Sequence, residues 1–325
     1  MITEDQAEVV AFLNSPASHG GEPVERIDTH TSIVFLAGDR AWKMKRAVRY
    51  GYLDYSSAGR RRAMCEAEFR INRRTAPGLY RGVTAVTRQA DGGLAIGGSG
   101  APVDWLVEMT RFDQSGLFDR LAEAGVLPLQ LMSPLALTVA RFHRTASGAP
   151  YHGGWDAMRG VIDGNAAGFA AEGAGILDPA RCASLTTRSR FVLDRGGVLL
   201  DQRRDDGLVR RCHGDLHLRN IVLLNGLPTL FDAIEFSDDI SSVDVLYDFA
   251  FLVMDLWRLN LPQHANLLWN DYLAETTDLN GLPLMPLFLS CRAAVSAKTT
   301  ATTARLEVDA VRRLALHSRA NRYLA

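Results

Sequence analysis

The first 110 residues carry the alternating pattern of apolar and polar positions that β-strands show. Residues 31–37 (TSIVFLA) are β-branched and apolar, and Gly38-Asp39 follows as a turn signal. Residues 40–46 (RAWKMKR) then place Trp42 and Met44 on one side of a strand and two lysines on the other. The pattern therefore predicts a β-hairpin that ends with two lysines on one face.

Further strands and one basic helix complete this front segment. Residues 82–88 and 103–109 predict two more strands, joined by a glycine-rich turn at 91–100. Between the hairpin and these strands, residues 57–75 predict a basic helix that Pro77-Gly78 ends. The first residues, MITEDQAEVVAFLNS, begin as an acidic amphipathic helix.

After residue 112 the periodicity becomes helical. Helices are predicted over 116–124, 134–145, parts of 164–203, 243–259, 263–276 and 285–325. Only the short runs 221–224 and 227–236 resemble strands. A β-rich front followed by a mainly helical remainder predicts an α+β chain of two lobes, 1–112 and 113–325.

Composition excludes several classes of protein. The chain has 325 residues and a net charge of −1, which gives no general attraction to nucleic acid or an anionic membrane. The arginines at 60–62 and 73–74 lack interleaved aromatic residues, so a solvated helix face is favoured over an RNA surface. Four scattered cysteines without a C-x-x-C pair fit a reducing compartment. With no signal peptide or long apolar run, we expect a soluble, cytoplasmic protein.

One polar segment stands out because it lies directly before an apolar strand. In HGDLHLRN (213–220), Asp215 and Asn220 are five residues apart, and Asp232 follows seventeen residues after Asp215 at the end of another apolar run. A tight loop would aim the first carboxylate at a substrate hydroxyl while the amide oxygen reaches a metal. A hairpin between the two runs would return Asp232 to the same metal. These are the groups that phosphoryl transfer from a nucleotide needs, with Mg²⁺ as the ion that oxygen ligands favour.

HGDLHLRN followed by LFDAIEF resembles the aminoglycoside phosphotransferase-like kinases, which include choline kinases and form a small-molecule branch of the protein-kinase fold. THTSIVFLAGDRAWKMKR, EFRINRRTAPGLYRGV, VEMTRF, ARFHRTA and DVLYDFAFLVMDL resemble an uncharacterised bacterial subfamily, and they span residues 29–255. The CRAAVSAK segment extends the likeness toward the C-terminus. The resemblance implies a two-lobed protein-kinase-like fold with a β-rich N-lobe and a mainly helical C-lobe.

The resemblance also implies roles for single residues. Asp215 matches the catalytic base, Asn220 a magnesium ligand, and Asp232 the aspartate that opens the metal-binding triplet. His213 matches the histidine that braces the catalytic loop, and Asp248 the acid that anchors it.

The nucleotide site follows from the same likeness. Lys43 matches the lysine that contacts the α- and β-phosphates, with Lys45 as the alternative. Glu68 matches the helix glutamate that pairs with this lysine, with Glu66 as the second choice. The adenine of ATP is expected near the hinge that follows Trp105–Met109, with Met109 as a contact.

Several positions depart from the family pattern. No G-x-G-x-x-G precedes the lysine strand, so residues 26–32 (RIDTHTS) would have to cover the phosphates. Ala233-Ile234 replaces the usual Phe-Gly, and Glu235 adds an acid that would touch the metal or the substrate. His217 either shapes the loop or touches the substrate. Acids in the segment after Asp232 (Glu235, Asp238, Asp239 and Asp244) suit a cationic acceptor, although a solvated acidic loop is the favoured explanation.

The sequence therefore predicts an ATP-dependent, Mg²⁺-requiring phosphotransferase that acts on a hydroxyl of a small metabolite. Amino sugars, other sugars, aminoglycosides and amino alcohols all fit as acceptors, and no pattern decides between ATP and GTP or specifies an oligomeric state. Two alternatives stay open: a kinase or nucleotidyl transferase acting on protein hydroxyls, and a non-catalytic nucleotide-sensing module. The altered triplet favours the module, and the intact Asp215, Asn220 and Asp232 oppose it.

Overall fold

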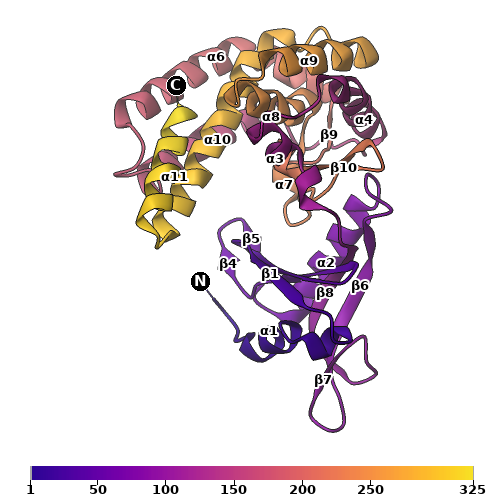
Figure 1. Ribbon diagram of the computed structural model, residues 1–325. Helices are drawn as coiled ribbons and strands as arrows, with labels where there is room; N and C mark the ends of the chain where they lie inside the picture. Colours follow the sequence, from indigo (N-terminus) through magenta and orange to yellow (C-terminus); the bar gives the residue numbers. More distant parts are fainter. Residues whose placement is uncertain (1, 325) are drawn as a thin grey trace. The chain divides into compact units, whose positions relative to one another are not determined.

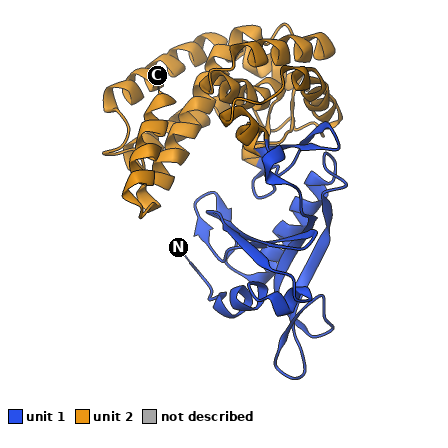
Figure 2. Ribbon diagram, viewed as in Figure 1, with its two compact units in different colours: residues 1–117, 220–238 blue, residues 118–219, 239–325 orange. Residues whose placement is uncertain are grey.

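The computed structural model describes residues 2–324, and they form two compact units (Figure 2). Residues 1–117 and 220–238 make the first unit, and residues 118–219 and 239–325 make the second. The end residues Met1 and Ala325 lie outside the described range.

The first unit is built on an antiparallel sheet of six strands in the order β1-β2-β3-β8-β6-β7 (Figure 1). Its strands are β1 (Val24–Asp28), β2 (Ser32–Ala37), β3 (Arg40–Lys45), β6 (Tyr80–Arg88), β7 (Leu94–Ile96) and β8 (Ala101–Thr110). Two further hairpins are β4 (Arg49–Tyr50) with β5 (Leu53–Asp54), and β10 (Ile221–Leu224) with β11 (Leu227–Leu230). Its helices are α1 (Ala7–Leu13) and α2 (Ala58–Asn72).

The two helices pack on opposite faces of the sheet. Val9 and Leu13 of α1 join a cluster that contains Trp42 and Met44 of β3. Cys65 of α2 joins a second cluster, which contains alternate residues of β3 and β8. The alternation read from residues 40–46 is therefore confirmed, because the apolar residues of β3 face α1 and the two lysines face α2.

The second unit is mainly helical, with one short pair of strands. Its helices are α3 (Phe118–Glu123), α4 (Met132–Thr145), α5 (Gly154–Ala171), α6 (Pro179–Asp205), α8 (Val245–Arg258), α9 (Pro262–Thr276), α10 (Met285–Leu306) and α11 (Ala310–Arg322). The strands β9 (Val209–Arg211) and β12 (Ser242–Asp244) pair antiparallel, and α7 (Asp238–Ser241) is a single turn. Short 3-10 helices are Leu129–Leu131 and Leu282–Leu284 in this unit, Pro16–His19 and Gln114–Gly116 in the first unit, and Leu218–Asn220 where the chain passes from the second unit to the first. Helix α8 is buried along almost its whole length, as its continuous apolar run predicts.

The structure differs from the sequence-based reading at several places, of which three bear on the site. The predicted second lobe contained residues 220–238, whereas these residues group with the first unit, where Val222 bridges Leu117 and Phe231 packs on the α2 side of the sheet. The predicted strand 227–236 ends at Leu230 instead, because Asp232 has a left-handed backbone with φ of 60°. The glycine-rich turn at 91–100 contains the short strand β7, which pairs with β6.

Among the described residues, no helix combines the length and the apolar character needed to cross a membrane.

Candidate functional site

Two lysines of β3 share one glutamate of α2. Lys43 donates from Nζ to Glu68 Oε1 at 2.8 Å, and Lys45 donates from Nζ to Glu68 Oε2 at 2.7 Å. This sharing follows from the two-residue period of the strand, which places both ammonium groups on the face that α2 covers. Glu66, the second choice for this pairing, is instead exposed and pairs with Arg62 one helical turn away.

The two lysines keep Glu68 ionised although it is fully buried. Burial by itself raises the pKa of Glu68, but the charges of Lys43 and Lys45 outweigh burial and lower the pKa to about 2. Burial likewise works to lower the pKa of Lys43, and the carboxylates of Asp232 and Glu68 raise it well above its usual value. Glu68 and both lysines are therefore charged at neutral pH.

The hairpin of β10 and β11 returns the chain from Asn220 to Asp232. Ile221 pairs with Leu230, and the N–H of Phe231 donates to the carbonyl of Asn220 at 3.0 Å, so the two polar residues flank the same end of the hairpin. Asp232 then departs from the strand with its left-handed backbone, and its N–H donates to the hydroxyl of Tyr80 at 3.1 Å. Lys43 donates to Asp232 Oδ1 at 2.5 Å.

Asn220 and Asp232 suit a magnesium ion by the chemistry of their donor atoms. An amide oxygen and a carboxylate oxygen are hard ligands of the kind that Mg²⁺ prefers, and the ion usually keeps further waters or phosphates. The side chain of Asp232 is 41% exposed, so solvent and ligands can reach the carboxylate. Glu235 does not share this exposure, because its side chain is only 6% exposed and contacts Lys45 and Tyr55.

The loop that carries Asp215 (residues 213–219) lies in the second unit. Gly214 has φ of 81°, a left-handed conformation that favours glycine, and it directly precedes Asp215. The carboxylate of Asp215 lies 3.2 Å from Nε2 of His217. Burial raises the pKa of Asp215, but His217, followed by His213 and Arg219, brings the pKa below its ordinary value. Asp215 is thus an ionised carboxylate beside an imidazole.

Asp248 holds the backbone of this loop. Its Oδ1 accepts from the N–H of Gly214 at 2.8 Å, and its Oδ2 accepts from the N–H of His213 at 3.1 Å. His143 also lies against Oδ2 through Nε2, at 3.1 Å, and Arg292 forms an ion pair with Asp248 at 3.7 Å. Asp248 and His213 are fully buried, which fits the bracing and anchoring roles that the resemblance implies for them.

Sequence reasoning missed three residues that hold the backbone beside the predicted site residues of each unit. Arg292 donates from Nη1 to the carbonyl of Gly214 at 3.2 Å, and Tyr272 lies 2.8 Å from Nδ1 of His143 through its hydroxyl. In the first unit, Asn72 bonds both the N–H and the carbonyl of Ala233. Arg292 lies in the CRAAVSAK segment, so the likeness of that segment was an unused signal.

Other predicted contributors are placed as follows. Met109 is buried on β8, in the cluster on the α2 side of the sheet. In the turn between β1 and β2, the hydroxyl of Thr29 bonds the backbone of Ser32 and is used within the turn itself. Of the acids after Asp232, Asp244 caps α8 and forms a buried ion pair with Arg203, so it is not part of a solvated acidic loop.

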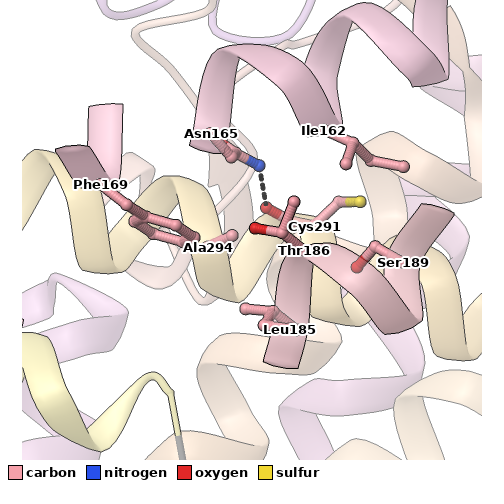
Figure 3. A pocket seen from close by; sticks show the side chains of 8 residues that line it. All are labelled: Ile162, Asn165, Phe169, Leu185, Thr186, Ser189, Cys291 and Ala294. Atoms are coloured by element: carbon pink, nitrogen blue, oxygen red, sulfur yellow. Dashed lines mark hydrogen bonds between the residues drawn. The ribbon is translucent and has the colours of Figure 1, made fainter. Parts of the chain in front are cut away.

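Two hollows in the second unit lack the size or the charge that a pocket for a cationic metabolite needs. The smaller one, between α5, α6 and α10, has a volume of about 10 Å³, room for about one water molecule (Figure 3). In Figure 3, Asn165 donates to the carbonyl of Cys291 across it, at 3.3 Å. The larger one, about 370 Å³, lies along α6 and α10 and is lined in part by Arg181 and Arg188. Its two arginines would repel a cation.

Comparisons with known proteins identify the fold. No family model matches the chain. Uncharacterised proteins of Mycobacterium tuberculosis and Mycobacterium bovis are 28% identical to it over 284 residues, which make up 83% of this chain and 53% of theirs. The chain therefore spans about half the length of the curated relatives it matches.

Solved structures resemble the chain over nearly its whole length. A choline kinase of Cryptosporidium parvum covers 93% of it, with 88% of its own chain, a TM-score of 0.55 and 11% identity. An aminoglycoside 2′-phosphotransferase in complex with GDP covers 97%, with 98% of its own chain, a TM-score of 0.53 and 14% identity. The chain has the fold of these small-molecule kinases. A thermostable aminoglycoside phosphotransferase bound to AMP-PNP and hygromycin B shares this kinase fold, with a TM-score of 0.51, 14% identity and 98% of each chain covered.

Proposed function

We propose that the protein is a Mg²⁺-dependent kinase that transfers the γ-phosphate of ATP to a hydroxyl group of a small metabolite. The observation that carries the proposal is the double contact of Lys43 with Glu68 and Asp232. Glu68 and Asp232 belong to separate motifs that follow Lys43 by 25 and 189 residues in the sequence. In the structure both carboxylates contact the ammonium group of Lys43. A chain that had lost catalysis would have no reason to keep all three.

Each residue of the proposed machinery has a role that its surroundings support. Lys43 is the cation for the nucleotide phosphates, and Glu68 holds it in place from the buried side. Asn220 and Asp232 would hold Mg²⁺, which neutralises phosphate charge during transfer. The GDP and AMP-PNP complexes of the structural neighbours support a nucleotide as the donor.

Asp215 is proposed to orient the accepting hydroxyl and to take its proton. Because the pKa of Asp215 lies below its ordinary value, the carboxylate is ionised at neutral pH and is a weak base. A weak base suffices, since phosphoryl transfer passes through a loose transition state in which the hydroxyl proton leaves late. The lowered pKa therefore favours orientation of the oxygen over early removal of the proton.

The acceptor is proposed to be a small hydroxylated compound of the kind that the neighbours use. Choline kinase and the aminoglycoside phosphotransferases are named for amino alcohol and amino sugar substrates, and both have this fold. Asp244 is neutralised by Arg203, and Glu235 contacts Lys45, so two of the acids that suggested a cationic acceptor already have cationic partners. Uncharged sugars therefore belong in any substrate screen beside amines.

The test is a thermal-shift screen with Mg-ATP and with Mg-GTP, first alone and then with amines, sugars, amino sugars and aminoglycosides. A ligand that binds only the native state raises the melting temperature by mass action, so the screen requires no knowledge of the product. We expect a shift with nucleotide that depends on Mg²⁺ and grows with one class of acceptor. The absence of a shift with either nucleotide at millimolar concentration would refute this proposal, whereas a nucleotide shift that no acceptor increases would favour the non-catalytic nucleotide-sensing alternative.

A further inference from the structure

Lys45 and Glu235 form a second ion pair beside the one that the family pattern names. Lys45 lies between Glu68 and Glu235 and donates to both carboxylates. The hydroxyl of Tyr55 donates to Glu235 Oε1 at 2.5 Å, and its ring lies 4.9 Å from the ammonium of Lys45. The group is closed off from solvent, because the side chain of Lys45 is 1% exposed.

The two lysines of β3 therefore have different surroundings. The side chain of Lys43 is 15% exposed and reaches a carboxylate, Asp232, that is itself open to solvent. Lys45 has only buried carboxylates around it, with Glu68 at 0% and Glu235 at 6% exposure. A nucleotide phosphate can approach Lys43, whereas Lys45 already has its charge balanced by groups that stay inside the protein.

Several contacts fix residues 232–236, and Glu235 makes one of them. The N–H of Asp232 is held by Tyr80, and the N–H of Ala233 donates to Asn72 Oδ1 at 2.7 Å. Glu235 then ties the segment to β3 through Lys45. The segment is thus attached to α2 through Asn72, to β6 through Tyr80 and to β3 through Lys45.

From these contacts we infer that Lys45 and Glu235 are positioning residues, a buried pair that fixes residues 232–236 on β3 and so holds the Asp232 carboxylate beside Lys43. The inference rests on the proposed function, because it assigns the pair to the same site. The ion pair at Glu235 adds to the restraints that Tyr80 and Asn72 place on the segment.

The pair has a physical signature that separates it from a merely apolar contact. Removing Lys45 leaves the Glu235 carboxylate buried without a cation, and removing Glu235 leaves Lys45 with Glu68 alone, whereas removing both keeps the net charge of the group unchanged. Lys43, Lys45, Glu68, Asp232 and Glu235 together hold two cations against three carboxylates. Loss of Lys45 alone would leave Lys43 as the one cation of this group, and Lys43 would be drawn toward Glu68 and away from Asp232.

The experiment compares Glu235→Gln, Lys45→Met and the double variant with the wild type. Glu66→Gln is the matched control, an exposed acid on α2 that pairs only with Arg62 in the described contacts. Hydrogen exchange of a peptide covering residues 231–237 is measured first, without nucleotide or metal. KM for the nucleotide, kcat and the Mg²⁺ concentration for half-maximal rate are then measured with the acceptor found in the screen.

We expect faster exchange of the amides of Asp232 and Ala233 in both single variants, and unchanged exchange in the control. We also expect the half-maximal Mg²⁺ concentration and KM for the nucleotide to rise about tenfold, with kcat largely restored at saturating Mg²⁺. The double variant should have an exchange rate and a half-maximal Mg²⁺ concentration no higher than those of the more impaired single variant, because the effects of coupled residues are not additive. Glu235→Gln keeps the size of the side chain, so it decides the inference even if Lys45→Met does not fold.

The outcomes separate this inference from the proposed function. Exchange and kinetics of Glu235→Gln that match the wild type would overturn the pairing role while the kinase activity stands. Independent effects of the two single variants, which multiply in the double variant, would also overturn it. An inactive wild type whose single variants exchange faster at residues 232–233 would refute the kinase and leave the structural role of the pair intact.

Discussion

Asp248 offers the sharpest test of how the catalytic loop is held, through the substitution Asp248→Asn. The change keeps the shape of the side chain and removes its charge. In the wild type the two carboxylate oxygens accept from the N–H groups of Gly214 and His213 and lie against His143. An asparagine has only one oxygen, so its NH₂ group faces either a backbone donor or the imidazole.

The magnitude follows from these contacts. Hydrogen bonds to a charged group contribute about 1.5–3 kcal/mol each, and breaking a buried ion pair by removing one partner costs about 3–5 kcal/mol. Arg292, 3.7 Å from Asp248, is such a partner. We therefore expect the free energy of unfolding of the second unit to fall by about 3–5 kcal/mol. For a unit of about 190 residues, that corresponds to a melting temperature lower by about 10 °C.

The pH dependence has a definite sign. Burial raises the pKa of Asp248, but hydrogen bonding and charge from His143, Arg292 and His213 bring the folded-state pKa below the ordinary 3.8. A group with a lowered folded pKa contributes its full stability above the unfolded pKa and loses it as pH falls through the folded pKa. The difference between wild type and Asp248→Asn should therefore be the same at pH 7 and pH 5, and shrink below about pH 3.8.

Urea unfolding followed by circular dichroism at several pH values measures both quantities. Asp163→Asn on α5 is the control, because Asp163 is exposed and its ion pairs with Arg190 and Arg159 lie on the surface. A melting temperature of Asp248→Asn within about 2 °C of the wild type would refute the anchoring role. A difference that grows on acidification would refute the assigned sign of the pKa shift.

Three further substitutions have expected outcomes of their own. Arg203→Met should lower the free energy of unfolding by about 3–5 kcal/mol in urea titration, because it leaves Asp244 and Asp278 buried without their shared cation; an unchanged midpoint would contradict this. Tyr272→Phe should cost about 1 kcal/mol, since the stacking on Phe249 remains and only the hydrogen bond to His143 is lost, and a loss as large as that of Arg203→Met would show that more than one bond is involved. Lys43→Met should weaken Mg-ATP binding at least about tenfold in calorimetry. Its melting temperature should change little, because Asp232 is partly exposed and Glu68 still pairs with Lys45. Wild-type affinity for Mg-ATP would instead indicate that Lys45 contacts the phosphates.

The sequence predicted the part of the site that depends on the spacing of residues close together in the chain. The alternation in residues 40–46 was enough to place Lys43 and Lys45 on one face of β3, and the two apolar runs after Asn220 were enough to predict the hairpin that leads to Asp232. Each depends on neighbours within a few residues, where the period of a strand or the length of a turn leaves little freedom.

Contacts between distant segments were beyond sequence reasoning. The inner face of α2 is polar, with Arg61, Glu68 and Asn72 all buried, so no apolar stripe marked which side faces the sheet. Arg61 finds its partner Asp104 on β8, and Asn72 finds Ala233, across separations of 43 and 161 residues. The assignment of residues 220–238 to the first unit depends on similar long-range packing, which a division of the chain into consecutive lobes could not anticipate.

The central claim is phosphate transfer to a small hydroxylated acceptor with Asp215 as the base. Mass spectrometry of the acceptor selected by the thermal-shift screen, after incubation with Mg-ATP and either wild-type protein or Asp215→Asn, tests it most directly. The account predicts one added phosphate per acceptor with the wild type, and a rate lower by about 10²–10⁴ with Asp215→Asn, whose nucleotide binding stays intact. Equal rates for the two proteins would contradict the role of Asp215, and nucleotide binding without transfer to any acceptor would contradict the kinase itself.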